Sequence, residues 1–180
     1  GVETLKSLSN QIADNEETAT PRYDKSLNNG YGDRAPPSDW PKVSGPLDVI
    51  LFEGWMLGFR PLDDVKACEA VHPGLVAVNE ALKQYEGKWD AFVDAWMVIK
   101  VSDYLWVKEW RLQAEVAMRA KGLPGMTDQQ VSDFVDRFLP AYRAYLPALY
   151  DLGPTTYSAD GDMALLTIEV DSKRNVHRAT

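Results

Sequence analysis

Apolar residues recur at a helical spacing in the first twelve residues of the chain, and this periodicity then stops. Val2, Leu5, Leu8 and Ile12 lie three to four positions apart, which predicts a helix from Val2 to Ile12. From Asp14 to Pro46 the chain is rich in Gly, Pro, Asn, Asp and Ser and shows no apolar period. We therefore expect a long loop with at most one short extended piece. Loops of this length within a compact domain are commonly functional or mobile.

Three short apolar runs predict strands. The first, from Leu47 to Gly54, carries large and β-branched apolar residues up to Glu53 and predicts a buried strand. The runs from Asp94 to Val101 and from Ala164 to Val170 predict two more, the last followed by a charged tail. Helical patterns lie between these strands, so we expect an α/β fold with a parallel sheet and flanking helices. Three strands are few for one domain of 180 residues, and we expect strands to be missing at the N-terminal side.

The predicted helices carry recognisable end signals. Two short ones, Asp63 to Ala70 and Gly74 to Tyr85, are separated by Pro73. A long one from Ser102 or Asp103 through Ala120 ends at Gly122 and Pro124. Thr127 and Gln130 form a capping box for a further helix, which Pro140 and Pro147 should bend or break.

Composition and charge narrow the function classes. The net charge of −8 argues against nucleic acid, whose binding depends on clustered Lys and Arg. No apolar run is long enough to cross a membrane. Cys68 has no second cysteine and is expected to be a reduced core thiol, and the distant His72 and His177 argue against zinc. These features predict a soluble globular protein.

Glu53 and Gly54 are the first candidates for chemistry because they end a predicted strand. In open α/β sheets, ligands bind beyond the carboxyl ends of the strands. A carboxylate there can bind Mg²⁺ or orient a hydroxyl, and glycine lets the backbone pass close to a ligand. The alternative, weighed equally, is a strand-end acid that points into water. Trp55 follows directly and is a candidate for stacking on a ligand, whereas the other tryptophans are expected in the core.

A charged stretch of the long loop is the second candidate. Pro21-Arg22-Tyr23-Asp24-Lys25-Ser26 is followed by Gly30, Gly32, Asp33 and Arg34. Arg and Lys pair with carboxylate or phosphate oxygens, and Asp accepts a hydroxyl proton, so the mixture suits a polyhydroxy anion. Taken alone, a solvated loop whose Gly and Asp only make turns is the commoner explanation.

The long helix is the third candidate. Arg111, Glu115 and Arg119 recur every four residues and share one face. A surface ladder of ion pairs is the commoner explanation of this spacing. The alternative is an arginine that stabilises charge on a transferring phosphoryl group.

Together these segments resemble the plant- and fungus-type D-glycerate 3-kinases, relatives of uridine kinase, pantothenate kinase and phosphoribulokinase among the P-loop kinases. The narrowest matches are Glu53-Gly54-Trp55-Met56-Leu57-Gly58-Phe59 and Trp110-Arg111-Leu112-Gln113-Ala114-Glu115. Further matches are the Arg22-Tyr23-Asp24 loop, Asp94-Ala95-Trp96 and Gly125-Met126-Thr127-Asp128. The resemblance implies transfer of the γ-phosphate of ATP, with Mg²⁺, to the 3-hydroxyl of D-glycerate. It also implies photorespiration in a chloroplast, or a cytoplasmic enzyme if the source is cyanobacterial or fungal.

By the same resemblance, the residues take roles that we state as hypotheses. The substrate-binding set is Arg22, Tyr23, Asp24, Lys25, Arg34, Gly54 and Trp55. The catalytic set is Glu53, Asp24, Arg111 and Arg119, with Glu53 also near the magnesium ion. The helix 103–121 would belong to a lid over the phosphates.

The sequence departs from the family in one motif. No Gly-x-x-x-x-Gly-Lys-Ser/Thr phosphate loop occurs in the 180 residues. We therefore expect a single truncated kinase domain, the C-terminal portion of a longer enzyme, with negligible activity by itself. The alternatives are another small-molecule P-loop kinase, acting on a nucleoside, pantothenate or a sugar phosphate, or a short non-catalytic paralogue that binds a ligand or partner.

Overall fold

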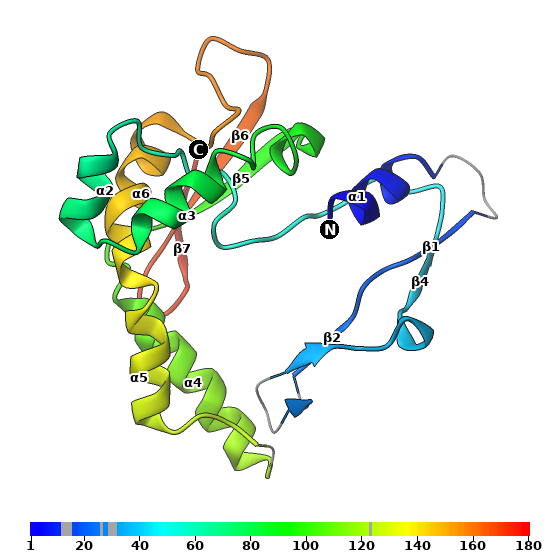
Figure 1. Ribbon diagram of the computed structural model, residues 1–180, viewed down its shortest axis with the longest axis horizontal. Coiled ribbons are helices and arrows are strands. Elements are labelled where there is room, and N and C mark those ends of the chain that lie inside the picture. Colours follow the sequence, from blue (N-terminus) through cyan, green and yellow to red (C-terminus); the bar gives the residue numbers. More distant parts are fainter. Residues whose placement is uncertain (12–15, 26, 29–31, 123) are drawn as a thin grey trace. The chain divides into compact units, whose positions relative to one another are not determined.

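The computed structural model describes residues 1–180 apart from 12–15, 26, 29–31 and 123 (Figure 1). The chain forms two compact units. One comprises Gly1–Gly54 with Met118–Gly125, and the other comprises Trp55–Ala117 with Met126–Thr180.

The first unit contains a short helix and two small antiparallel ladders. Helix α1 (Val2–Ser9) confirms most of the predicted helix, whose last residue, Ile12, lies outside the described residues. Strand β1 (Glu17–Ala19) pairs with β4 (Lys42–Ser44), and β2 (Tyr23–Asp24) pairs with β3 (Asp33–Arg34). A 3-10 turn, η2, spans Pro37–Asp39. The stretch predicted as a loop with one extended piece therefore holds four short strands.

Gln11 joins the helix to the first ladder. Its side-chain amide donates to the carbonyl oxygens of Glu16 at 2.9 Å and Val43 at 3.0 Å, and the residue is buried. Two backbone carbonyls thus receive a side-chain donor in a unit with few apolar residues to bury. This local bonding holds the start of β1 and the middle of β4 beside the end of α1.

The predicted buried strand from Leu47 to Gly54 is wrong in this structure. These residues form no strand, and Val49 and Leu51 are 82% and 84% exposed. A strand is held by hydrogen bonds to a neighbouring strand, because its own backbone groups cannot pair with one another. No described strand pairs with this run, so an apolar pattern that suits a sheet remains without regular structure.

The second unit contains a three-stranded sheet in the order β5-β6-β7. Strands β5 (Ala95–Val101) and β6 (Ala164–Val170) are parallel, with Ala95 opposite Ala164 and Val101 opposite Val170. Both predicted strands and the parallel α/β class are confirmed. The predicted charged tail is corrected: Val176–Ala179 forms β7, antiparallel to β6. Asp171 makes this turn possible, since its Oδ1 accepts from the backbone N–H groups of Lys173 and Asn175.

Five α-helices belong wholly or mainly to this unit: α2 (Val65–Val71), α3 (Leu75–Leu82), α4 (Trp106–Ala120), α5 (Asp128–Asp136) and α6 (Leu139–Leu152). The predicted capping box is present, with Thr127 and Gln130 bonded in both directions. Pro140 occupies the first turn of α6, where its missing N–H costs nothing, and so α5 and α6 are separate helices. Pro147 lies inside α6 without ending it.

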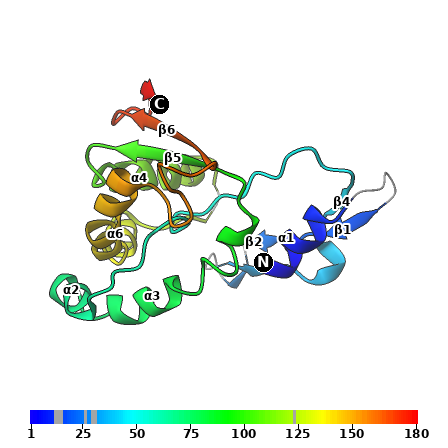
Figure 2. The ribbon, with the colours of Figure 1, turned by 90° about the horizontal axis from the view of Figure 1, so that it is seen from above.

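The core lies between one face of the sheet and the helices. Cys68, Leu82 and Tyr145 are at most 1% exposed, and they pack in one cluster with Phe59 and with Val98 of β5. Figure 2 shows α6 and α3 on the same side of β5 and β6. Cys68 is a buried free thiol, as the sequence predicted. Among the described residues no helix is long and apolar enough to cross a membrane.

Candidate functional site

The ladder β2–β3 brings the two charged pieces of the predicted substrate loop together. Tyr23 lies opposite Arg34, and Asp24 lies opposite Asp33. The ring of Tyr23 lies over Gly32, whose φ is +79°, and a Cβ atom there would come within 2.5 Å of the ring. Only glycine fits both the backbone conformation and this contact. The glycine in this motif is therefore explained by how the hairpin closes.

The charged side chains of this hairpin fall into two groups. Asp33 is engaged locally, since it accepts from the backbone N–H of Arg34 at 2.7 Å and from the side chain of Asn28 at 3.2 Å. Arg22, Lys25 and Arg34 are exposed. A second bond from the N–H of Ala35 to the carbonyl of Arg22, 2.8 Å long, extends the pairing. Of the predicted loop, Ser26 and Gly30 lie outside the described residues.

Glu53 and Gly54 are both exposed, and they follow a run without regular structure. Glu53 makes no hydrogen bond or ion pair with another described residue, and the structure does not join it to the β2–β3 hairpin. Its carboxylate is chemically suited to Mg²⁺, a hard cation that prefers oxygen ligands. Among the described residues, no three acidic, His or Cys side chains cluster in a way that could hold a metal ion. A magnesium role for Glu53 therefore stays a prediction.

Trp55 begins the second unit and packs on its aromatic side chains. Its ring meets Phe138 edge-on, with centroids 4.8 Å apart, and Tyr142 at 5.6 Å. Such edge-to-face pairs each contribute roughly 0.5–1.5 kcal/mol beyond the area that they bury. Trp55 nevertheless stays 45% exposed, so part of the ring is accessible to a ligand.

Packing explains much of the narrow motif that runs from Glu53 to Phe59. Gly58 has a φ of +77°, and a Cβ atom there would lie 2.8 Å from Pro154 and 3.3 Å from the ring of Trp96. Phe59 is 2% exposed and stacks on Tyr145 at 5.5 Å. The C-terminal half of the motif is therefore part of the core.

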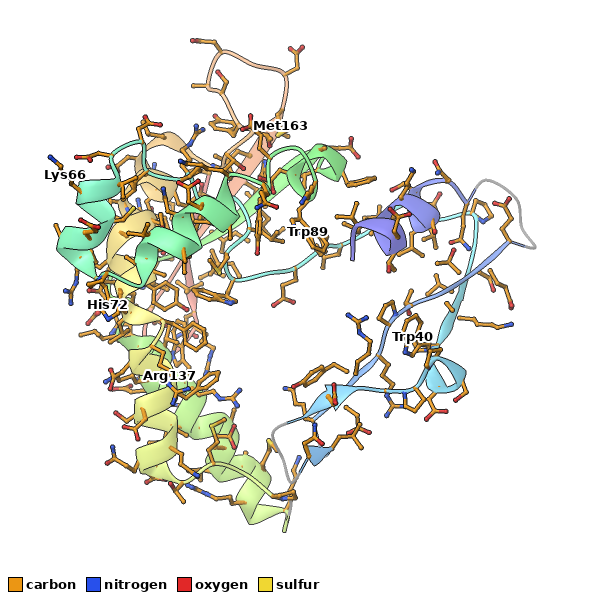
Figure 3. All side chains as sticks on the ribbon, in the orientation of Figure 1. Trp40, Lys66, His72, Trp89, Arg137 and Met163 are labelled. Atoms are coloured by element: carbon orange, nitrogen blue, oxygen red, sulfur yellow. The ribbon has the colours of Figure 1, made fainter. Side chains whose placement is uncertain are left out.

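The arginine helix α4 lies beside α5, and Arg111 and Lys108 of α4 both contact residues of α5. Arg111 Nη2 lies 2.5 Å from Glu115 Oε1, and the guanidinium lies 5.4 Å from the ring of Phe134 on α5. Glu115 is only 3% exposed, so this is not the surface ladder that the spacing usually indicates. Figure 3 shows side chains crowded along these two helices up to Arg137, where α5 ends. Arg119, the other predicted arginine, lies one turn beyond Glu115 on α4 and has an interaction partner of its own.

An ion pair joins the start of α4 to the end of α5. Lys108 Nζ lies 2.6 Å from Asp136 Oδ1. This hydrogen bond lowers the pKa of Asp136 below its ordinary value. In the aromatic cluster nearby, burial raises the pKa of the Tyr142 hydroxyl above its ordinary value.

The sequence did not predict the structural roles of two side chains, Arg60 and Trp110. Arg60 donates to the carbonyl oxygens of Leu152, Gly153, Pro154 and Tyr157, at 3.3, 2.8, 2.7 and 2.7 Å. It thereby satisfies carbonyls at and after the end of α6. Trp110 was assigned to the core, but its indole N–H donates at 2.7 Å to the carbonyl of Ser172 in the β6–β7 turn. Neither residue carries a local signal, because their partners lie 62 or more positions away in the sequence.

Comparisons with known proteins identify the relatives of the chain. No protein-family model matches it. The chloroplastic D-glycerate 3-kinase of Arabidopsis thaliana is 52% identical over 174 residues, which are 97% of this chain and 37% of that protein. The chain is a homologue of D-glycerate 3-kinases. The solved structure of the D-glycerate 3-kinase from Cryptococcus neoformans superposes with a TM-score of 0.82 and 33% identity, over 99% of this chain and 64% of that one.

A third relative extends the likeness to yeast. A probable ATP-dependent kinase of Saccharomyces cerevisiae is 35% identical over 172 residues, which are 93% of this chain and 57% of that protein. The resemblance predicted from the sequence motifs is confirmed. As a D-glycerate 3-kinase homologue, the chain spans only about a third to just over half the length of these two curated relatives.

Proposed function

We propose that the whole protein to which this chain belongs transfers the γ-phosphate of ATP to the 3-hydroxyl of D-glycerate, giving 3-phosphoglycerate and ADP. The observation that carries the proposal is the 52% identity to the Arabidopsis D-glycerate 3-kinase over 97% of the chain. The closure of the predicted substrate loop into one hairpin supports it, because exposed cations and a carboxylate then stand next to one another.

In this proposal the hairpin binds the acceptor. Arg22, Lys25 and Arg34 supply cations for the glycerate carboxylate, and an arginine can donate two parallel hydrogen bonds to it. Asp24 accepts the proton of the 3-hydroxyl as that oxygen forms its bond to the γ-phosphorus. The bond between the γ-phosphorus and the bridging oxygen breaks, and ADP leaves. Tyr23, which is 60% exposed, bounds the site.

The residues outside the hairpin would serve the phosphates. Glu53 would hold the magnesium ion directly or through water, with Gly54 allowing close backbone approach. Bound there, Mg²⁺ supplies positive charge against the phosphate oxygens. Arg111 and Arg119 would stabilise the charge that spreads over the transferring group. Trp55 would contact the bound substrate through the exposed part of its ring.

The 180 residues alone are expected to turn over D-glycerate at a negligible rate. Phosphoryl transfer depends on positioning and charge stabilisation, and the sequence holds no phosphate-binding loop. Measured side by side, the isolated chain should be at or near the uncatalysed background under conditions in which the whole protein is active. Clear ATP-dependent turnover by the isolated chain would contradict this expectation.

A substrate panel tests the proposal against other small-molecule kinases. The whole protein is assayed for ADP release with D-glycerate, L-glycerate, uridine, pantothenate and ribulose 5-phosphate, each with Mg·ATP. We expect turnover with D-glycerate to exceed that with every other acceptor. Preference for another acceptor would assign the protein to a different kinase activity, and silence with all five would favour a non-catalytic binding protein.

We also propose a chloroplast location and a role in photorespiration. The support is the name of the Arabidopsis relative, which is chloroplastic. A cytoplasmic location is the alternative if the source is cyanobacterial or fungal. A fluorescent fusion of the whole protein, imaged in its own cells, separates the two.

A further inference from the structure

Helix α4 has an unusual interior residue. Its fifteen residues carry leucine, valine, methionine and tryptophan, yet its buried residue is the acid Glu115, which is 3% exposed. Glutamate is almost never fully buried unless it is paired, because removing a carboxylate from water costs several kcal/mol. The burial of Glu115 must therefore be explained by the hydrogen-bond partners of its two carboxylate oxygens.

The two oxygens have different partners. Oε1 accepts from Nη2 of Arg111, one turn earlier on α4, at 2.5 Å. Oε2 accepts from the backbone N–H of Met126 at 2.9 Å, just before the Thr127 capping box that begins α5. One carboxylate thus fixes an arginine side chain and also ties the start of α5 to α4.

Arg111 is held on a second side by an aromatic ring. Its guanidinium lies 5.4 Å from the ring centre of Phe134. Its Nε atom is buried and has no hydrogen-bond partner among the described residues, while the side chain as a whole keeps 34% of its surface exposed. The guanidinium is therefore constrained by the ion pair and the ring, while part of the Arg111 side chain remains exposed.

The position of this arrangement in the fold agrees with a role at the phosphates. Helix α4 follows the carboxyl end of β5, and ligands of open α/β sheets bind beyond the carboxyl ends of strands. The Lys108–Asp136 ion pair joins the first turn of α4 to the last residue of α5. Along α4, Arg111 lies between Lys108 and Glu115, which contact Asp136 and Met126 respectively. Figure 1 shows α4 and α5 side by side.

We propose that Glu115 is a positioning residue, which holds the Arg111 guanidinium in one orientation for a phosphate group of the bound nucleotide. The inference rests on the proposed kinase function and deepens it. An arginine that is oriented before the reaction needs no reorganisation when charge develops, and such preorganisation is the main source of electrostatic catalysis. A glutamate that only joined the two helices would affect folding and leave the chemical step unchanged.

The first test uses the whole protein and steady-state kinetics with Mg·ATP and D-glycerate. Glu115→Gln keeps an oxygen that can accept from Met126 and removes the charge that orders Arg111. We expect kcat to fall by at least about tenfold, as for the loss of one charge-stabilising group, with KM for D-glycerate within about twofold of wild type. We expect Arg111→Met to lower kcat as well, and Arg111→Met with Glu115→Gln to be no slower than Arg111→Met alone.

Glu80→Gln is the matched control. Glu80 pairs with Lys83 on the surface of α3, with 55% of its side chain exposed, and its loss should leave kcat unchanged. A wild-type kcat for Glu115→Gln, or losses that add in the double variant, would overturn the positioning role. A melting temperature recorded for each variant separates loss of fold from loss of rate.

The second test does not depend on the substrate. In the whole protein, hydrogen exchange of the Arg111 Nε–H is followed by nitrogen-15 NMR. We expect exchange at least about tenfold faster in Glu115→Gln than in wild type, and no change in Glu80→Gln, because a released side chain exposes this buried atom. Unchanged exchange in Glu115→Gln would overturn the proposal. A whole protein that is inactive with D-glycerate would overturn the proposed function, while this exchange rate still decides whether Glu115 orders Arg111.

Discussion

Replacing Gly58 by alanine tests whether the narrow Glu53–Phe59 motif is partly a packing motif. Gly58 has a φ of +77°, a conformation that costs an ordinary residue roughly 1–2 kcal/mol. The new Cβ atom would also lie 2.8 Å from the Cβ atom of Pro154, which belongs to a ring with little freedom to move. Overpacking of this kind costs about 1–3 kcal/mol. We expect Gly58→Ala to lower the free energy of unfolding by about 2–5 kcal/mol.

Two other glycines separate the contributions. Gly122 also has a positive φ, +72°, but a Cβ atom there meets nothing within 4 Å, so Gly122→Ala should lose only the roughly 1–2 kcal/mol of backbone strain. At Gly87 a Cβ atom likewise meets nothing within 4 Å, and its φ lies outside the left-handed region. Gly87→Ala should therefore stay within about 0.5 kcal/mol of wild type.

The assay is urea unfolding of the chain, followed by circular dichroism and analysed by linear extrapolation. The expected order of stability loss is Gly58→Ala, then Gly122→Ala, then Gly87→Ala. A Gly58→Ala variant that loses no more than Gly122→Ala would refute the steric part of the reasoning. A Gly122→Ala variant as stable as wild type would refute the part that rests on φ.

Two further substitutions, at Arg60 and Asp90, test interactions within the second unit. Arg60→Leu removes the donors to four backbone carbonyls. Each buried acceptor left unpaired costs about 1–3 kcal/mol, and water replaces some of the lost donors, so we expect the free energy of unfolding to fall by roughly 3–5 kcal/mol in the same urea assay. The control is Lys42→Met, which breaks an exposed ion pair with Glu17. Burial raises the pKa of Asp90, whose Oδ2 accepts from Thr155, above its ordinary 3.8. As the pH rises, the unfolded state releases this proton before the folded state does, so the free energy of unfolding falls between about pH 3.8 and the folded-state pKa. The difference in unfolding free energy between wild type and Asp90→Asn should therefore change over that pH interval and be constant above it. A difference that does not vary with pH would contradict the assignment.

Sequence patterns predicted the elements whose signals are local. The capping box at Thr127 and Gln130, the seven-residue strands β5 and β6, and the separation of α5 from α6 at Pro140 all follow from residues within one or two turns. The charged loop was also singled out by its unusual residue types, and its substrate role stays a prediction. That its two pieces pair into one hairpin depends on the register of Tyr23 with Arg34, which no local pattern specifies.

The errors and omissions have a common physical cause. The run from Leu47 to Gly54 has the composition of a strand, but a strand also needs a neighbour, and composition does not report one. The spacing of Arg111 and Glu115 was recognised, whereas the burial of Glu115 was not, because it depends on Met126 beyond the end of the helix. Arg60 and Trp110 bond to carbonyls far along the chain, and so their roles follow only from the tertiary structure.

The most direct test of the central claim is the identity of the product. The whole protein is incubated with D-glycerate and Mg·ATP, and the phosphorylated acid is examined by phosphorus-31 and proton NMR. The account predicts 3-phosphoglycerate, formed in equal amount to ADP and absent when ATP is left out. Phosphate on the 2-hydroxyl, or no phosphorylated glycerate at all, would contradict it.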